Sequence, residues 1–163
     1  MLEAVIFDFD QTIADTSGLE EYRRQGQWNE VYRNFDKIKK YENISEVFNA
    51  LKSKGIKIGV VTNSPSQYCT KAFEYLGLHY DNIVGYHDTR LKKPFADPVL
   101  YSLQKLEVKN KNKTLGFGDH INDIISYKRA NIVPIACMWG ATNNFNPNCL
   151  KIFNPYEILE LIF

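Results

Sequence analysis

A chain of 163 residues with a formal net charge of +1 has neither the strongly basic balance of a nucleic-acid-binding domain nor an acidic tail. Its length suits a single domain, residues 1–163, and its 44% hydrophobic content is enough for a sizeable core. Cys69, Cys137 and Cys149 are an odd number without CxxC spacing, which argues against a disulfide framework and a structural zinc site. Because no apolar run approaches about 18 residues, we expect a cytoplasmic protein with no membrane contact.

Short apolar runs rich in β-branched residues predict the strands. In chain order they are 4–9, 56–61, 82–85, 114–118 and 132–137, with 149–153 as a possible sixth. Their nearly continuous hydrophobicity is typical of strands buried on both faces of a parallel sheet. Helical patterns alternate with them: one covers 44–54 and ends before Gly55, and three others begin at Ser64-Pro65, Asp97-Pro98 and Asn154-Pro155. The alternation predicts an α/β domain with a doubly wound parallel sheet.

Residues 16–43 interrupt this alternation between the first strand and the helix that leads to the second. Trp28, Val31, Tyr32, Phe35 and Ile38 recur at helical spacing, so part of the segment is predicted to be an amphipathic helix. Such an apolar stripe either packs on the core or forms a binding surface. We therefore expect a small helical cap insertion within the domain.

Polar side chains gather where the predicted strands end, which is where open parallel sheets bind their ligands. They are Asp8, Asp10, Thr62, Asn63, Lys92, Lys93, Asp119 and Asp123. Four converging carboxylates repel one another unless a cation relieves them, and oxygen ligands suit Mg²⁺. A hydroxyl, amides and a lysine beside that ion would bind a phosphoryl group.

The motifs DFDQT, VVTNSP, KKP and GFGDHIND closely resemble the four motifs of the haloacid dehalogenase-like hydrolase superfamily. The segments RANIVPIACMWG and NPYEILELIF also resemble that family's fifth strand and terminal helix, so the resemblance covers nearly the whole chain. Gln11 departs from the pattern, since many members have glycine there. The resemblance implies a Rossmann-like core and a magnesium-dependent phosphatase that acts on a phosphomonoester.

The resemblance also implies a role for each matching residue. Asp8 matches the nucleophile that forms an aspartyl-phosphate, and Asp10 matches the general acid that later activates water. Thr62 and Asn63 match phosphoryl-binding groups, and Lys93 fits the lysine position better than Lys92. Mg²⁺ would be held by Asp8, by Asp119 and by Asp10 through its backbone carbonyl, whereas Asp123 would be either a ligand or a residue that orients Lys93.

Other functions stay open at this stage. A phosphotransferase would share the first half-reaction. A phosphorylation switch resembling a receiver domain also uses Asp, Thr, Lys and Mg²⁺, but receivers have a mid-chain phosphorylated Asp and no acid like Asp10 two residues later. A catalytically idle binding protein would require degraded motifs. We expect a small phosphorylated substrate, with nucleic acid or phosphoprotein as alternatives, and a monomer or homodimer.

Overall fold

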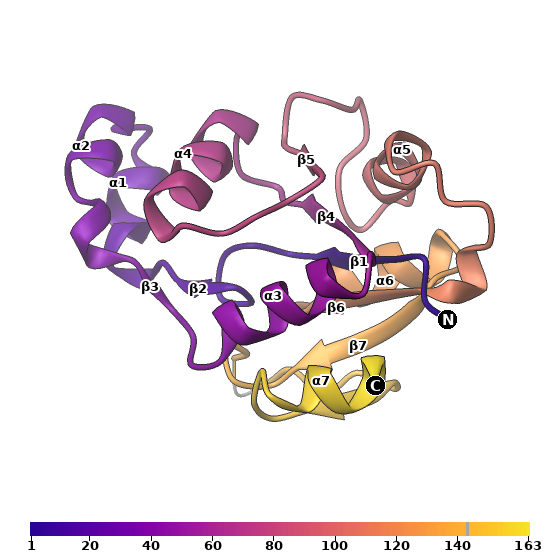
Figure 1. The fold of residues 1–163 in the computed structure, drawn as a ribbon. Coiled ribbons are helices and arrows are strands. Elements are labelled where there is room, and N and C mark those ends of the chain that lie inside the picture. Colours follow the sequence, from indigo (N-terminus) through magenta and orange to yellow (C-terminus); the bar gives the residue numbers. More distant parts are fainter. Residues whose placement is uncertain (143) are drawn as a thin grey trace.

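The computed structural model, which describes residues 1–142 and 144–163, arranges the chain in three layers (Figure 1). The middle layer is a sheet of six parallel strands in the order β5-β4-β1-β6-β7-β8. Their bounds are β1 (Ala4–Phe7), β4 (Lys57–Val61), β5 (Asn82–Val84), β6 (Thr114–Gly118), β7 (Val133–Cys137) and β8 (Leu150–Ile152). The predicted doubly wound parallel sheet is confirmed, including its sixth strand.

The strand order reverses at β1. The chain first adds β4 and β5 on one side of β1 and then returns to add β6, β7 and β8 on the other side. At the end of β1, Phe7 pairs with Val60 of β4 and with Phe117 of β6. Side chains that follow β1, β4 and β6 therefore meet at the point where the two halves of the sheet separate, which is where a parallel sheet binds its ligands.

Helices cover both faces of the sheet because alternate residues of each strand point to opposite sides. Val5 and Phe7 belong to the core that packs under α3 (Ile44–Ser53), α4 (Ser66–Leu76) and α7 (Glu157–Ile162). Ala4 and Ile6 belong to a second core under α5 (Asp97–Lys105) and α6 (Ile121–Arg129). Two separate cores hold the strands between them, so the ends of β1 are firmly positioned.

The helix ends correct the predicted caps. Pro65, Ala96 and Tyr156 occupy the N-cap positions of α4, α5 and α7, and none of these three helices has a side-chain cap. The hydroxyl of Ser64, predicted to cap α4, instead donates to Asp10. At the other end of a helix, Gly55 follows α3 with a φ of 67°, the left-handed conformation that favours glycine, as predicted.

The insertion is helical, as predicted, and contains two short α-helices. They are α1 (Glu20–Arg24) and α2 (Trp28–Arg33), and the strands β2 (Ala14–Asp15) and β3 (Lys39–Lys40) pair antiparallel beside them. Val31 and Ile38 are fully buried, and Trp28 and Phe35 lie with their rings 5.9 and 6.3 Å from that of Tyr68 on α4. The apolar stripe therefore packs on the core, and the insertion lies against α4 (Figure 1).

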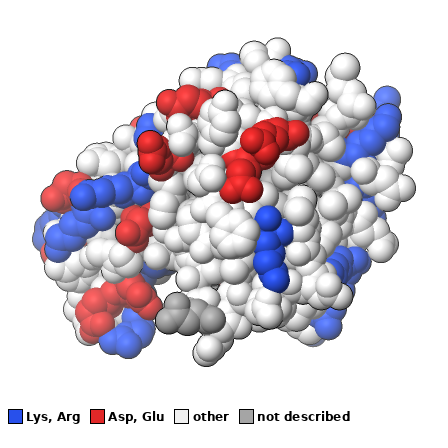
Figure 2. Space-filling view, turned by 90° about the horizontal axis from the view of Figure 1, so that it is seen from below, with Lys and Arg blue, Asp and Glu red and all other residues white. Residues whose placement is uncertain are grey.

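The surface agrees with the near-neutral charge. On the face shown in Figure 2, acidic and basic side chains are interspersed among uncharged ones. All three cysteines are free thiols, and those of Cys69 and Cys137 are buried. Among the described residues, no helix has both the length and the apolar character needed to cross a bilayer.

Candidate active site

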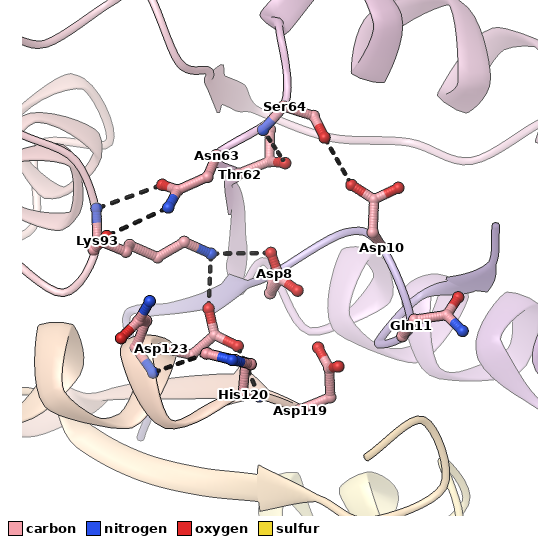
Figure 3. A pocket seen from close by; sticks show the side chains of 11 residues that line it. Asp8, Asp10, Gln11, Thr62, Asn63, Ser64, Lys93, Asp119, His120 and Asp123 are labelled. Carbon is pink, nitrogen blue, oxygen red and sulfur yellow. Dashed lines mark hydrogen bonds and ion pairs between the residues drawn. The ribbon is translucent and has the colours of Figure 1, made fainter. Parts of the chain in front are cut away.

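A cavity of about 390 Å³ lies at the carboxyl ends of β1, β4 and β6 (Figure 3). Its lining includes all seven residues singled out by the motifs, namely Asp8, Asp10, Thr62, Asn63, Lys93, Asp119 and Asp123. Gln11, Ser64, His120 and Asn122 complete the wall. Lys92 is absent from the lining, which supports Lys93 as the lysine of the third motif.

Lys93 is buried and uses all three protons of its ammonium group. Its Nζ donates to Asp8 Oδ1 at 2.8 Å, to Asp123 Oδ1 at 2.6 Å and to the carbonyl of Val61 at 2.8 Å. Burial by itself would lower the pKa of Lys93, but the carboxylates of Asp123 and Asp8 outweigh it and raise the pKa above its ordinary value. A permanently charged lysine therefore neutralises part of the acidic cluster.

Three carboxylates converge below Lys93. Asp8, Asp119 and Asp123 each offer an oxygen within 4.8 Å of the others. Burial, reinforced by the charge of Asp123, raises the pKa of Asp8 well above its ordinary value, and the same two causes raise the pKa of Asp119 to about 6. One lysine therefore leaves negative charge uncompensated, and a second cation would relieve it.

Asp10 does not join this cluster. Its Oδ1 accepts from Thr16 Oγ1 at 2.8 Å and from the Tyr68 hydroxyl at 2.9 Å, and its Oδ2 accepts from Ser64 Oγ at 2.8 Å. Arg23 Nη1 lies 3.1 Å from Asp10 Oδ1. The expectation that four carboxylate side chains converge is wrong. The Asp10 side chain is turned away from the other three (Figure 3), because it is bound by an arginine of the insertion and by three hydroxyl groups.

Thr62 and Asn63 follow the end of β4, and their side chains have different hydrogen-bond partners. The Thr62 hydroxyl accepts from the backbone N–H of Ser64 at 3.0 Å, which leaves its proton to donate into the cavity. The amide of Asn63 instead clamps the backbone of Lys93, donating to its carbonyl at 3.2 Å and accepting from its N–H at 3.3 Å. The Asn63 side chain therefore positions Lys93 and does not point into the cavity as a free donor.

The loop after β6 and the start of α6 orient two of the acids. Asp123 Oδ2 accepts from the backbone N–H of His120 at 3.0 Å, and His120 Nδ1 accepts from that of Asn122, which together form a capping box. Asp119 Oδ1 accepts from Thr12 Oγ1 at 2.9 Å. Each acid is therefore held by its own partner before any ligand binds.

The sequence reasoning missed the residues that surround Asp10. Arg23 and Thr16 belong to the insertion, where the sequence pattern indicated only an apolar stripe. Tyr68 lies on α4, where no motif distinguishes it from its neighbours. Ser64 lies within the second motif, VVTNSP, but the sequence indicated only a helix cap for it. Pairing between groups so distant in sequence becomes visible only when the insertion and α4 are in place.

A family comparison agrees with this geometry. The model of the family described as haloacid dehalogenase-like hydrolase matches residues 19–137. The chain belongs to this family. The matched range covers the second, third and fourth motifs.

Several relatives extend the match to the haloacid dehalogenase-like phosphatases. The chain is 38% identical over 104 residues to a phosphoglycolate phosphatase of Aquifex aeolicus, covering 63% of this chain and 48% of the relative. It is 29% identical over 122 residues to the pyrophosphatase PpaX of Oceanobacillus iheyensis, covering 74% and 55%. The chain thus spans about half the length of the curated relatives it matches.

Solved structures of the family share the fold. A haloacid dehalogenase superfamily hydrolase from Geobacter sulfurreducens superposes with a TM-score of 0.81 at 20% identity, covering 99% of this chain and all of that one. Within this family context, Gln11 has a φ of 64°, a conformation that costs glycine least. The glycine that the resemblance leads one to expect here would adopt this turn at lower cost than glutamine.

Proposed function

We propose that this haloacid dehalogenase-like chain is a phosphatase that hydrolyses phosphomonoesters through an aspartyl-phosphate on Asp8. The observation that carries the proposal is the buried Asp8 carboxylate at the end of the central strand, bonded to Lys93 at 2.8 Å on the wall of an open cavity. A carboxylate in this position has a charged partner to hold it and space for a phosphoryl group in front of it.

In the first step we assign the attack on phosphorus to the Asp8 carboxylate. The new bond joins Asp8 to phosphorus, the bond between phosphorus and the ester oxygen breaks, and Asp10 gives its proton to the departing oxygen. Lys93 and the Thr62 hydroxyl would bind the phosphoryl oxygens as charge is redistributed. The support is that all four residues line one cavity.

In the second step Asp10, now a carboxylate, takes a proton from water. That water attacks phosphorus, the bond to Asp8 breaks, and phosphate leaves with the Asp8 carboxylate restored. Asp10 lies two residues beyond Asp8 on the same cavity wall, so one side chain can serve both steps. This acid is also the feature that favours hydrolysis over a receiver-like switch.

The residues present fit Mg²⁺. Asp8, Asp119 and Asp123 offer only oxygen atoms, the ligands that this hard cation prefers. Burial and the charge of Asp123 raise the pKa values of Asp8 and Asp119, and a bound cation would stabilise their carboxylate forms. We propose that Asp8 and Asp119 hold the ion, with the Asp10 backbone carbonyl, while Asp123 chiefly orients Lys93. When bound, Mg²⁺ would offset the charge on nucleophile and phosphoryl group.

Small phosphorylated molecules are the substrates we propose. The insertion is packed on the core and the cavity wall is polar, so recognition would rest mainly on the phosphoryl group. Phosphoglycolate and pyrophosphate, the substrates in the names of the two relatives, therefore belong in the first panel together with alkyl and aryl phosphates.

The test is an assay of phosphate release from p-nitrophenyl phosphate and this panel, with Mg²⁺ and with excess EDTA. We expect turnover that requires Mg²⁺ and is lost in Asp8→Asn, whose folding is checked by thermal unfolding. A covalent phosphate found on any residue other than Asp8 would overturn the nucleophile. Labelled phosphate recovered on an added alcohol instead of water would favour the phosphotransferase.

A further inference from the structure

Arg23 is the one cation of the insertion that contacts the candidate general acid. Its guanidinium lies 3.1 Å from Asp10 Oδ1, and its side chain is about one-fifth exposed. The face of the Tyr68 ring supports it, with Cζ 5.5 Å from the ring centre. Its Nε is buried without a hydrogen-bond partner in the described part of the chain, so the two terminal nitrogens make its polar contacts.

The same guanidinium also contacts the groups that hold Asp10. Arg23 Nη1 donates to Ser64 Oγ at 3.4 Å, and Nη2 donates to Thr16 Oγ1 at 3.3 Å. Arginine can only donate hydrogen bonds, so the hydroxyl oxygen of Ser64 or Thr16 must be the acceptor in each contact. The one proton of each hydroxyl is then free to donate to another group. That proton goes to Asp10 in both cases, at 2.8 Å.

The network therefore has a defined direction. Arg23 orders the protons of Ser64 and Thr16, and these two hydroxyls and that of Tyr68 all donate to the Asp10 carboxylate. Burial raises the pKa of Tyr68, with the nearby charge of Asp10 adding to the effect, so its hydroxyl keeps its proton. Without the guanidinium, Ser64 and Thr16 could rotate their protons away from Asp10.

We infer that Arg23 is a positioning residue for Asp10, through which the insertion sets the orientation of the general acid. The inference rests on the proposed phosphatase function and assigns the insertion a part in it beyond core packing. A planar fork that reaches Asp10, Ser64 and Thr16 together is something a lysine ammonium cannot reproduce. Misplacing a catalytic group by about 1 Å can cost on the order of 10²-fold in rate.

Substrates with different leaving groups distinguish a role of Arg23 in positioning Asp10 from a general structural role. Proton transfer from Asp10 matters most when the leaving oxygen is strongly basic, as in ethyl phosphate, and least for p-nitrophenyl phosphate. We expect Arg23→Gln to lower kcat on ethyl phosphate by about 10²-fold and to change turnover of p-nitrophenyl phosphate far less. Arg23→Lys should fall between Arg23→Gln and the wild type on ethyl phosphate.

Two controls complete the experiment. Arg24 is exposed on the same helix and pairs only with Glu21, so Arg24→Gln should leave both substrates unchanged. In an Asp10→Asn background, Arg23→Gln should cost almost nothing further, since a positioning residue acts through the group it positions. Thermal unfolding identifies any variant that fails to fold, and Arg23→Lys then carries the comparison.

Equal loss on both substrates would overturn the inference, and so would a full additional loss in the Asp10→Asn background. Either result would give Arg23 a role independent of Asp10. Failure of the proposed function would look different, because the wild type would then hydrolyse neither substrate or Asp10→Asn would have no effect on ethyl phosphate.

Discussion

At the scale of single residues, the site contains buried charges of opposite sign in direct contact. Lys93 lies between Asp8 and Asp123 and satisfies one oxygen of each. Removing one partner of a buried ion pair leaves the other charge without compensation, which costs about 3–5 kcal/mol. We therefore expect Lys93 to contribute to stability as well as to the phosphoryl binding that we propose for it.

Lys93→Ala should abolish measurable turnover and lower the free energy of unfolding by about 3–5 kcal/mol. Lys92→Ala is the matched control, because Lys92 is half-buried, lies over the Tyr86 ring and is not part of the cavity wall. Urea denaturation and phosphate release measure the two effects. Equal losses in both variants would mean that the third motif is assigned in the wrong register.

The raised pKa of Asp119 predicts that the free energy of unfolding depends on pH in the absence of Mg²⁺. Its pKa is about 6 in the folded chain against an ordinary 3.8, so between these values the folded state binds more protons than the unfolded state. The free energy of unfolding therefore falls as the pH rises from about 4 to 6 and then levels off. Protonation of Asp119 below about pH 6 removes the cost of burying its charge and the repulsion from Asp123.

The measurement is the unfolding temperature in EDTA between pH 4.5 and 7.5 for the wild type and Asp119→Asn. We expect Asp119→Asn to be the more stable protein at pH 7.5 and the difference to shrink toward pH 4.5. A difference that grows on acidification would show that Asp119 is stabilised as a carboxylate.

At the scale of elements, the insertion is part of the core. Ile38 is 3% exposed and packs in the core beneath α3 and α4, together with Leu19 and Val31. Because these apolar side chains are buried, the insertion is packed on the core beside α4, with Arg23 next to Asp10.

Ile38→Ala should lower the free energy of unfolding by about 2–4 kcal/mol, the usual cost of a cavity of this size. Arg33→Ala should change it by less than about 0.5 kcal/mol, because Arg33 is exposed and makes only a surface pair with Glu30. Urea denaturation compares the two. If both variants were as stable as the wild type, the insertion would be only loosely attached to the core.

At the scale of the whole molecule, we expect the insertion and the α/β core to unfold as one cooperative unit, because they share a hydrophobic core. Removing residues 20–40 would take away the buried Val31 and Ile38 and uncover Tyr68, which contacts the rings of Trp28 and Phe35. At roughly 1.5–3 kcal/mol for each buried side chain, the loss approaches the stability of a domain, about 5–15 kcal/mol.

We therefore expect a chain in which a short glycine loop replaces residues 20–40 to lose cooperative thermal unfolding, followed by circular dichroism. Inserting two glycines at Gly26, in the exposed turn between α1 and α2, is the matched control and should be tolerated. A deletion variant that still folds and loses a sharp substrate preference would instead identify the insertion as a specificity lid.

The sequence by itself determined the sheet and the strand-end residues. Continuous apolar runs depend on local composition, and the carboxyl ends of parallel strands must meet, so the runs that became β1, β4 and β6 brought Asp8, Thr62 and Asp119 to one cavity. The resemblance in four short motifs added their roles. Gly55 was equally predictable, since its left-handed backbone is a local requirement.

Only the tertiary structure decided which polar groups pair. Ser64 looked like a helix cap and Asn63 like a phosphoryl donor, but Ser64 donates to Asp10 and the Asn63 side chain clamps the Lys93 backbone. A polar side chain can satisfy its hydrogen bonds in many ways, and the choice depends on which groups the packing brings within about 3 Å. Arg23 reaches Asp10 because buried side chains of the insertion dock it against α4, a contact that no local pattern encodes.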